Sequence, residues 1–96
     1  MHTATTAQRQ RQSVNVFCQP QRWPLHPWLP VSRKVHGDPE LGVIVDTRSY
    51  DVHGYDCCVF LVNMFEAPGT WQEMLDLPKI VYDTLEELAA DGWLAD

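Results

Sequence analysis

The clearest pattern of hydrophobic positions lies in two segments near the middle of the chain. Residues 41–47 (LGVIVDT) contain a run of β-branched residues, and residues 55–65 (YDCCVFLVNMF) are apolar at most positions. Short apolar runs of this kind are typical of strands buried on both faces. The segment 48–54 between them is polar and ends in glycine, which favours an antiparallel hairpin with a long loop.

Both faces of the second predicted strand are apolar. Successive side chains of a strand point to opposite faces of a sheet. Between residues 57 and 64, Asn63 is the one polar residue. We therefore expect one face of this strand to pack on a helix, and the other to pack on the N-terminal segment or on a second copy of the chain.

The last third of the chain changes to a helical pattern. Thr70 and Glu73 have the spacing of a capping box, which predicts a short helical turn ending near Leu77. A proline is well tolerated in the first turn of a helix. We therefore predict a second helix over 78–91 that begins at Pro78.

The predicted end of this second helix is acidic. Glu86, Glu87 and Asp91 lie where the helix dipole prefers cations. We expect an arginine from a second copy of the chain to offset these charges, with Arg9, Arg11 and Arg22 as the candidates. Gly92 suits the position after the last helical residue, and Trp93 is then placed to contact the last turn.

The N-terminal third lacks a regular pattern. Residues 1–13 are polar and predict a flexible basic arm, whereas residues 14–18 alternate like a short strand. Residues 20–30 hold four prolines together with Trp23 and Trp28, which excludes a helix and a central strand. We expect this segment to be extended and to lie over a surface of the protein.

Strands followed by a helix are typical of an α+β fold. We predict a small antiparallel sheet of three to four strands, with a central hairpin at about 41–47 and 55–65, packed against a C-terminal helix at about 78–91. An extended Pro- and Trp-rich N-terminal segment completes this fold. A chain of 96 residues supports one core, so residues 14–96 are predicted to form a single domain behind the arm 1–13.

Charge is distributed unequally along the chain. Residues 1–37 contain five Lys and Arg and no acid, whereas residues 38–96 contain thirteen acids and two bases. A basic segment joined to an acidic body favours association with a second copy, and we expect a dimer. The body has no basic groove, so we expect no binding to nucleic acid.

The lengths of the apolar runs and the number of cysteines indicate in which cellular compartment the protein resides. No segment has the roughly 18 apolar residues of a membrane span, and the N-terminus lacks a secretory pattern. We therefore expect a small, soluble, cytoplasmic protein that does not contact membranes. Cys18, Cys57 and Cys58 are then reduced thiols, and pairing of Cys18 with Cys57 or Cys58 stays an open alternative.

The densest group of polar side chains lies between residues 51 and 58. Asp51, His53, Asp56 and the two cysteines are metal-binding residue types, but they lack the spacing of a CxxC, HExxH or HxH motif. We expect no metal and no cofactor. A cysteine in an apolar strand is most often inert because burial raises its pKa, so a His53–Cys57 pair gives little reason to expect an enzyme.

Ten aromatic residues exceed what a core of this size needs, so some are predicted to lie at an interface or to line a pocket. The candidates are Trp23, Trp28, Tyr55, Phe60, Phe65 and Trp71, with His53, Glu66 and Glu73 as candidate polar residues. We predict a non-enzymatic interaction protein that self-associates. The alternatives are a small-molecule-binding protein or minor enzyme with an aromatic pocket, and an acidic inhibitor or modulator of a protein with a basic surface.

Overall fold

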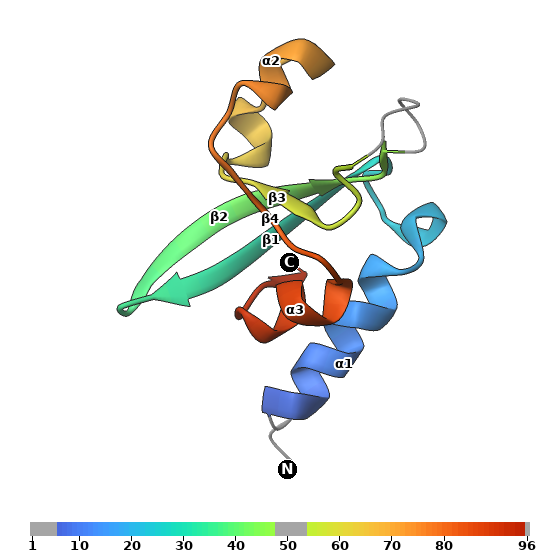
Figure 1. Cartoon of the computed structure of the whole chain (residues 1–96), viewed down its shortest axis with the longest axis vertical. Helices are drawn as coiled ribbons and strands as arrows, with labels where there is room; N and C mark the ends of the chain where they lie inside the picture. Colours follow the sequence, from blue (N-terminus) through green and yellow to red (C-terminus); the bar gives the residue numbers. More distant parts are fainter. Residues whose placement is uncertain (1–5, 48–53, 96) are drawn as a thin grey trace.

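The computed structural model describes residues 6–47 and 54–95 (Figure 1). Its elements in chain order are α1 (Thr6–Phe17), the 3-10 helix η1 (Pro20–Arg22), β1 (Trp28–Val35), β2 (Asp38–Val45), β3 (Cys58–Phe60), the 3-10 helix η3 (Met64–Glu66), α2 (Trp71–Leu75), β4 (Lys79–Val81), α3 (Leu85–Ala90) and β5 (Leu94–Ala95). The strands form one antiparallel sheet in the order β4-β3-β2-β1-β5. The predicted α+β class is confirmed, and the sheet is larger than predicted.

Helices cover both faces of this sheet. α1 and α3 lie together on one side, which we call the first face, and α2 lies on the other side, the second face (Figure 1). Because side chains alternate along a strand, each central strand contributes to both cores. Ile44 belongs to the first-face core, while Val43 and Val45 belong to the second. This double burial explains the continuous apolar run in β2.

Two separate groups of buried residues fill these layers. The first-face core consists of Phe17, Trp23, Leu29, Val31, Ile44, Val59, Leu88, Ala89 and Trp93. The second-face core consists of Val43, Val45, Cys58, Phe60 and Met74, with Met64 and Trp71 among the half-buried residues packed against it. The cover of Phe60 therefore comes from η3 and α2 of the same chain, where the sequence led us to expect the N-terminal segment or a second copy.

The prediction of a strand at 14–18 is wrong, because these residues belong to α1 and its end. Val14 and Phe17 pack on the first-face core, and their spacing of three residues is the helical one. Residues 1–5 of the predicted arm lie outside the described residues, and residues 6–13 are helical. Packing of α1 against α3 and β5 supplies a helix-stabilising contact that the local sequence does not reveal.

The proline-rich segment is extended in part. Pro20–Arg22 forms one turn of 3-10 helix, because a proline at the start of a helix needs no N–H partner. β1 begins at Trp28, includes Pro30 and lies between β2 and β5, which contradicts the exclusion of a central strand. β5 pairs with Val31 and Ser32 of β1 and not with Pro30, so the missing N–H of Pro30 breaks none of the described strand pairs.

The hairpin formed by β1 and β2 is long and reaches beyond the helices. His36 and Gly37 connect the two strands with φ angles of 52° and 85°, the left-handed backbone of a tight two-residue turn. The register that follows places Ser32 opposite Leu41 and Arg33 opposite Glu40. Figure 1 shows the end of the hairpin extending away from α2. Part of the second face is therefore left without a helix above it.

The second predicted strand and the C-terminal helix are shorter than expected. The strand predicted at 55–65 is reduced to β3, and the segment predicted as the start of the helix at 78–91 forms β4, which pairs with β3. Thr84 Oγ1 accepts a hydrogen bond from the Glu87 backbone N–H at 3.1 Å, so α3 begins after Thr84. The β-branched pair Ile80 and Val81 suits a strand better than a helix.

The predicted helix caps are confirmed. Thr70 Oγ1 accepts a hydrogen bond from the Glu73 backbone N–H at 3.2 Å at the start of α2. Gly92 has a φ of 100° after α3, and its N–H donates to Ala89 O at 3.0 Å. Glu86 and Glu87 lie in the first turn of α3, where the helix dipole favours acids. The predicted need for a cation beside these two residues is therefore wrong.

Candidate functional site

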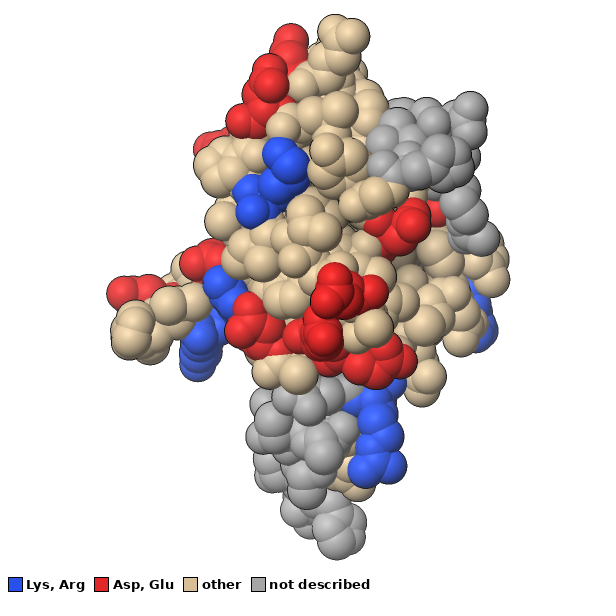
Figure 2. Space-filling view, viewed as in Figure 1, with Lys and Arg blue, Asp and Glu red and all other residues tan. Residues whose placement is uncertain are grey.

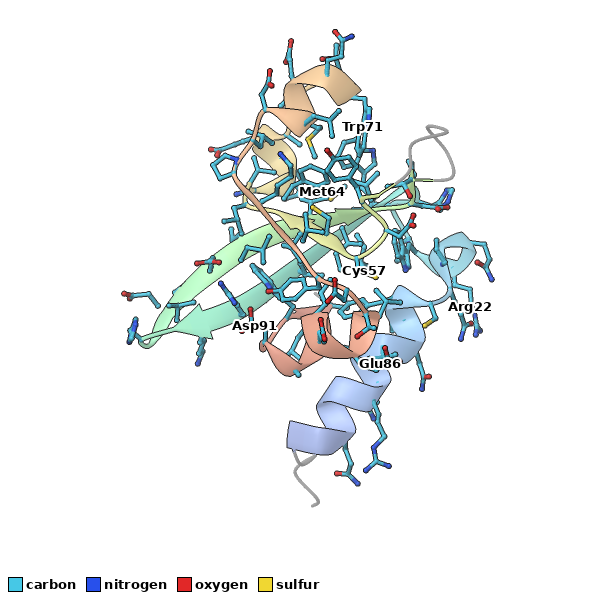
Figure 3. All side chains as sticks on the ribbon, viewed as in Figure 1. Arg22, Cys57, Met64, Trp71, Glu86 and Asp91 are labelled. Atoms are coloured by element: carbon cyan, nitrogen blue, oxygen red, sulfur yellow. The ribbon has the colours of Figure 1, made fainter. Side chains whose placement is uncertain are left out.

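The six candidate aromatic residues do not converge on one pocket. Trp23 is buried in the first-face core, where its Nε1 donates to Val16 O at 2.8 Å. Phe60 is fully buried in the second-face core and meets Trp71 edge-on, with ring centroids 5.6 Å apart. Trp28 and Tyr55 are half-buried against the same core. Five of the six candidates thus have packing roles, and Figure 3 shows Trp71 beside Met64 between α2 and the sheet.

Phe65 differs from the other five candidates. Its side chain is 93% exposed, more than that of any other large hydrophobic residue in the described part of the chain. It borders an open groove of about 200 Å³ on the second face, which we call the apolar groove. The groove is lined by Leu25, Pro30, Val31, Leu41, Gly42, Asn63, Met64 and Phe65. Leu25 and Leu41 on its walls are also exposed, by 50% and 44%.

Asn63 explains why this groove forms and why Phe65 points outward. It ends the extended segment and starts η3: Asn63 Oδ1 accepts from the Phe65 backbone N–H at 3.0 Å, and Asn63 O accepts from the Glu66 N–H at 2.8 Å. Met64 then packs on the second-face core while Phe65 stays in solvent. Asn63 is the one polar residue between positions 57 and 64 of the predicted strand. A polar residue in an otherwise apolar run is the sequence signal for this break.

Of the candidate polar residues, Glu66 and Glu73 lie in the described part of the chain and do not line the apolar groove. Glu66 and Glu73 are exposed, and His53 and Asp51 lie outside the described residues. Asp56 accepts a hydrogen bond from Thr47 Oγ1 at 2.5 Å, which ties the end of β2 to the start of β3. Over residues 6–47 and 54–95, no cluster of three or more His, Cys, Asp and Glu is arranged to hold a metal ion.

The three cysteines are free thiols in different surroundings. Cys18 is exposed, Cys57 is half-buried and Cys58 is buried. Burial raises the pKa of the Cys57 thiol, and Asp56 and Glu86 raise it further. Burial also raises the pKa of the Cys58 thiol, to about 11, against a smaller opposing effect of Lys79. Both shifts disfavour the thiolate, which is the nucleophilic form of cysteine.

The raised pKa of Cys58 predicts a loss of stability in alkali. A thiol whose pKa is higher in the folded state stabilises the fold fully below its unfolded value, near 9, and this contribution is lost as pH rises to 11. We expect Cys58 to account for about 2 to 3 kcal/mol of unfolding free energy lost over this window. Urea unfolding of the wild type and of Cys58→Ala at pH 8 and 11 measures this loss. Equal losses in both proteins would contradict the assignment.

A network of polar contacts around Arg33 fixes the C-terminal segment to the hairpin. Arg33 pairs with Glu40 at 3.0 Å and with Asp91 at 2.7 Å, and its guanidinium lies 4.7 Å from the centre of the Trp93 ring. Trp93 Nε1 donates to Tyr82 OH at 3.0 Å, and Tyr82 OH donates to Asp91. Burial opposes the charge of Arg33, but the hydrogen bond to Glu40 and the nearby carboxylates outweigh it and raise its pKa.

This network provides the cation that was predicted to offset the charge of Asp91. The cation is Arg33 of the same chain, brought to the end of α3 by the β1–β2 register. An arginine from a second copy is therefore not required there. Sequence reasoning missed this contact because Arg33 and Asp91 are far apart along the chain, and spacing carries no signal for such a pair.

A second polar contact joins the segment before β1 to the end of β2. His26 Nε2 lies 2.8 Å from Asp46 Oδ2, and Asp46 N donates to Pro27 O at 2.8 Å. The His26 ring also lies against Trp23, with centroids 6.4 Å apart. Asp46 is buried and His26 is exposed to solvent in part. These contacts hold Leu25 in place at one end of the apolar groove.

Acidic side chains gather on the surface around α3 (Figure 2). Asp83, Glu86, Glu87 and Asp91 are all exposed there, and Figure 3 shows Glu86 and Asp91 at the two ends of this helix. Arg33 of β1 contacts this surface through its ion pair with Asp91. This acidic surface is polar, unlike the apolar groove on the opposite face of the sheet.

Comparisons with known proteins do not add to this picture. A scan of family models, a search of curated proteins and a search of solved structures each found no significant match to the chain. None of the helices in the described ranges is long and apolar enough to cross a membrane.

Proposed function

We propose that this chain is a non-enzymatic binding protein that recognises a protein surface through the apolar groove. The observation that carries the proposal is the 93% exposure of Phe65 beside this groove, while the other candidate aromatics pack in the cores. A single exposed apolar residue is ordinary, but several grouped around a groove are typical of an interaction site.

The chemistry of the groove supports this proposal. Its walls are apolar, and its one polar side chain, Asn63, accepts a hydrogen bond from the Phe65 backbone N–H at the start of η3. A site that orients a small substrate commonly has several convergent polar groups. The apolar groove offers instead a surface on which an aromatic or aliphatic side chain of a partner can be buried. Phe65 and Leu41, at its rim, are the residues expected to dominate binding.

Cys18, Cys57 and Cys58 are all free thiols, which supports our proposal of a reducing compartment such as the cytoplasm. The acidic surface around α3 favours a second candidate function, the modulation of a partner with a basic surface. Such a partner would bind more weakly as salt is added.

Selection of peptides tests the main proposal. Random peptides displayed on phage are selected against the full chain, immobilised at low density so that copies do not meet. We expect aromatic and aliphatic peptides that bind the wild type and lose at least about 10-fold in affinity for Phe65→Ser or Leu41→Ser.

Val81→Ser is the matched control, because Val81 is 55% exposed on β4 and lies outside the groove. Peptides should bind this variant as they bind the wild type. Failure to enrich any peptide, or equal binding to Phe65→Ser and the wild type, would rule out the groove as the binding surface.

A further inference from the structure

We infer that the occupant of the apolar groove is a second copy of this chain, in a two-fold symmetric dimer in which Phe65 of each copy enters the groove of the other. The inference rests on the proposed function, since it names the partner for the same site. It also moves the predicted self-association from the basic N-terminal arm to the second face of the sheet.

The groove and Phe65 are complementary in size and chemistry. A cavity of about 150 Å³ lined by apolar side chains is enough to hold a benzene ring. The apolar groove has a volume of about 200 Å³ and apolar walls, so a phenyl ring fits into it. Each copy therefore carries both the protruding ring and the hollow that accepts it. A two-fold interface requires this combination, because both copies contribute the same surface.

Two exposed residues of opposite charge, Lys34 and Glu66, lie on the two segments of the chain that flank the groove and make its surroundings self-complementary. Lys34 is exposed on β1, on the same face of the strand as Pro30 and Ser32, so it lies on the hairpin side of the groove. Glu66 is exposed next to Phe65 and lies on the η3 side. A two-fold axis through the groove exchanges these two sides. It therefore brings Lys34 of each copy toward Glu66 of the other.

This local complementarity matters because whole copies repel each other. Each chain has a net charge of −6, so two chains have no general electrostatic attraction. Arg33, a major cation of the N-terminal half, is already paired with Glu40 and Asp91. The favourable contributions left for association are burial of the groove and the two Lys34–Glu66 pairs. The pairs fix the orientation of the copies more than they raise affinity.

The solution mass of the full chain, measured by sedimentation equilibrium over a range of concentrations, tests the inference. We expect a wild-type species of twice the 11.0 kDa chain mass. Phe65→Ser should raise the dimer dissociation constant by about 100-fold or more, because an anchor worth about 10-fold or more is lost in both copies. Val81→Ser and Arg11→Glu, which change exposed residues outside the groove, should leave it unchanged.

Charge reversal tests the two-fold arrangement. Lys34→Glu and Glu66→Lys should each weaken the dimer roughly 10-fold, since each places like charges across the interface twice. An equimolar mixture of the two variants should form a heterodimer of wild-type affinity, because each 34–66 contact again joins opposite charges. The double variant should also recover the homodimer.

The outcomes separate this inference from the proposed function. A monomer at all concentrations would overturn the dimer, while peptide binding that depends on Phe65 would leave the groove as a binding surface. A dimer insensitive to Phe65→Ser, or broken by Arg11→Glu alone, would place the interface elsewhere and overturn the inference. Loss of affinity in both charge variants without recovery in their mixture would overturn the two-fold arrangement.

Discussion

Replacing Trp93 by alanine is expected to lower the free energy of unfolding by about 3 to 5 kcal/mol, the range for loss of a fully buried large aromatic residue. Trp93 is fully buried and joins the first-face core to the network around Arg33. The substitution removes its packing and leaves Tyr82 and Arg33 without the indole. Small domains are stable by only about 5 to 15 kcal/mol, so much of the total stability is lost.

Gly42 shows how closely Trp93 fits. A Cβ at this position would collide with Val59 Cγ1 and lie 3.1 Å from Trp93 Cζ3. The Trp93 indole can therefore pack here only because residue 42 has no side chain. Urea unfolding of Trp93→Ala measures the effect, and Trp93→Phe is the milder comparison because it keeps a ring beneath Arg33. Val81→Ala, at an exposed position, should change stability by less than about 0.5 kcal/mol. A similarly small effect of Trp93→Ala would contradict the assigned core.

Phe60→Ala is expected to cost about 3 to 5 kcal/mol, whereas Phe65→Ala should cost less than about 0.5 kcal/mol. The two residues are of the same type and lie five positions apart, but Phe60 is fully buried against Trp71 and Phe65 is 93% exposed. The difference therefore measures burial with the chemistry of the side chain held constant. It also separates the role of Phe65 in binding from any role in folding.

Thermal and urea unfolding of the two variants, below the concentration at which copies associate, measure this difference. Loss of about 3 kcal/mol in Phe60→Ala corresponds to a fall of roughly 10 to 25 °C in melting temperature for a domain of this size. Equal destabilisation by both substitutions would contradict the exposure of Phe65. A stable Phe60→Ala variant would instead contradict the second-face core.

Local chemistry predicted part of this protein well. The antiparallel pairing of the 41–47 segment with the segment after it, the cap at Thr70 and the helix ending at Gly92 all follow from residue patterns within a few positions. The candidate site was predicted less well. Of the six aromatic candidates, Phe65 borders the groove, and its other walls at Leu25, Pro30 and Leu41 were not among the candidates.

The failures have a common physical origin. Residues 14–18 alternate like a strand, and residues 78–91 follow a helical pattern. However, the first segment belongs to α1 and its end, and Lys79–Val81 forms β4. A short segment is stabilised more by the surface it packs on than by its own propensity. Contacts of α1 with α3, and of β4 with β3, decided these structures. Such contacts join distant residues, so local patterns do not contain them.

The sequence by itself determined the fold class, the central antiparallel pairing, the caps of α2 and the end of α3, because each depends on periodicity or on side-chain to backbone bonds between near neighbours. Tertiary structure alone decided which apolar residues are buried and which remain exposed. The pairing of Arg33 with Asp91 and the exposure of Phe65 beside Leu41 each depend on where distant segments meet in space. A hydrophobic side chain favours burial, but it is buried only where the packed fold brings other residues against it.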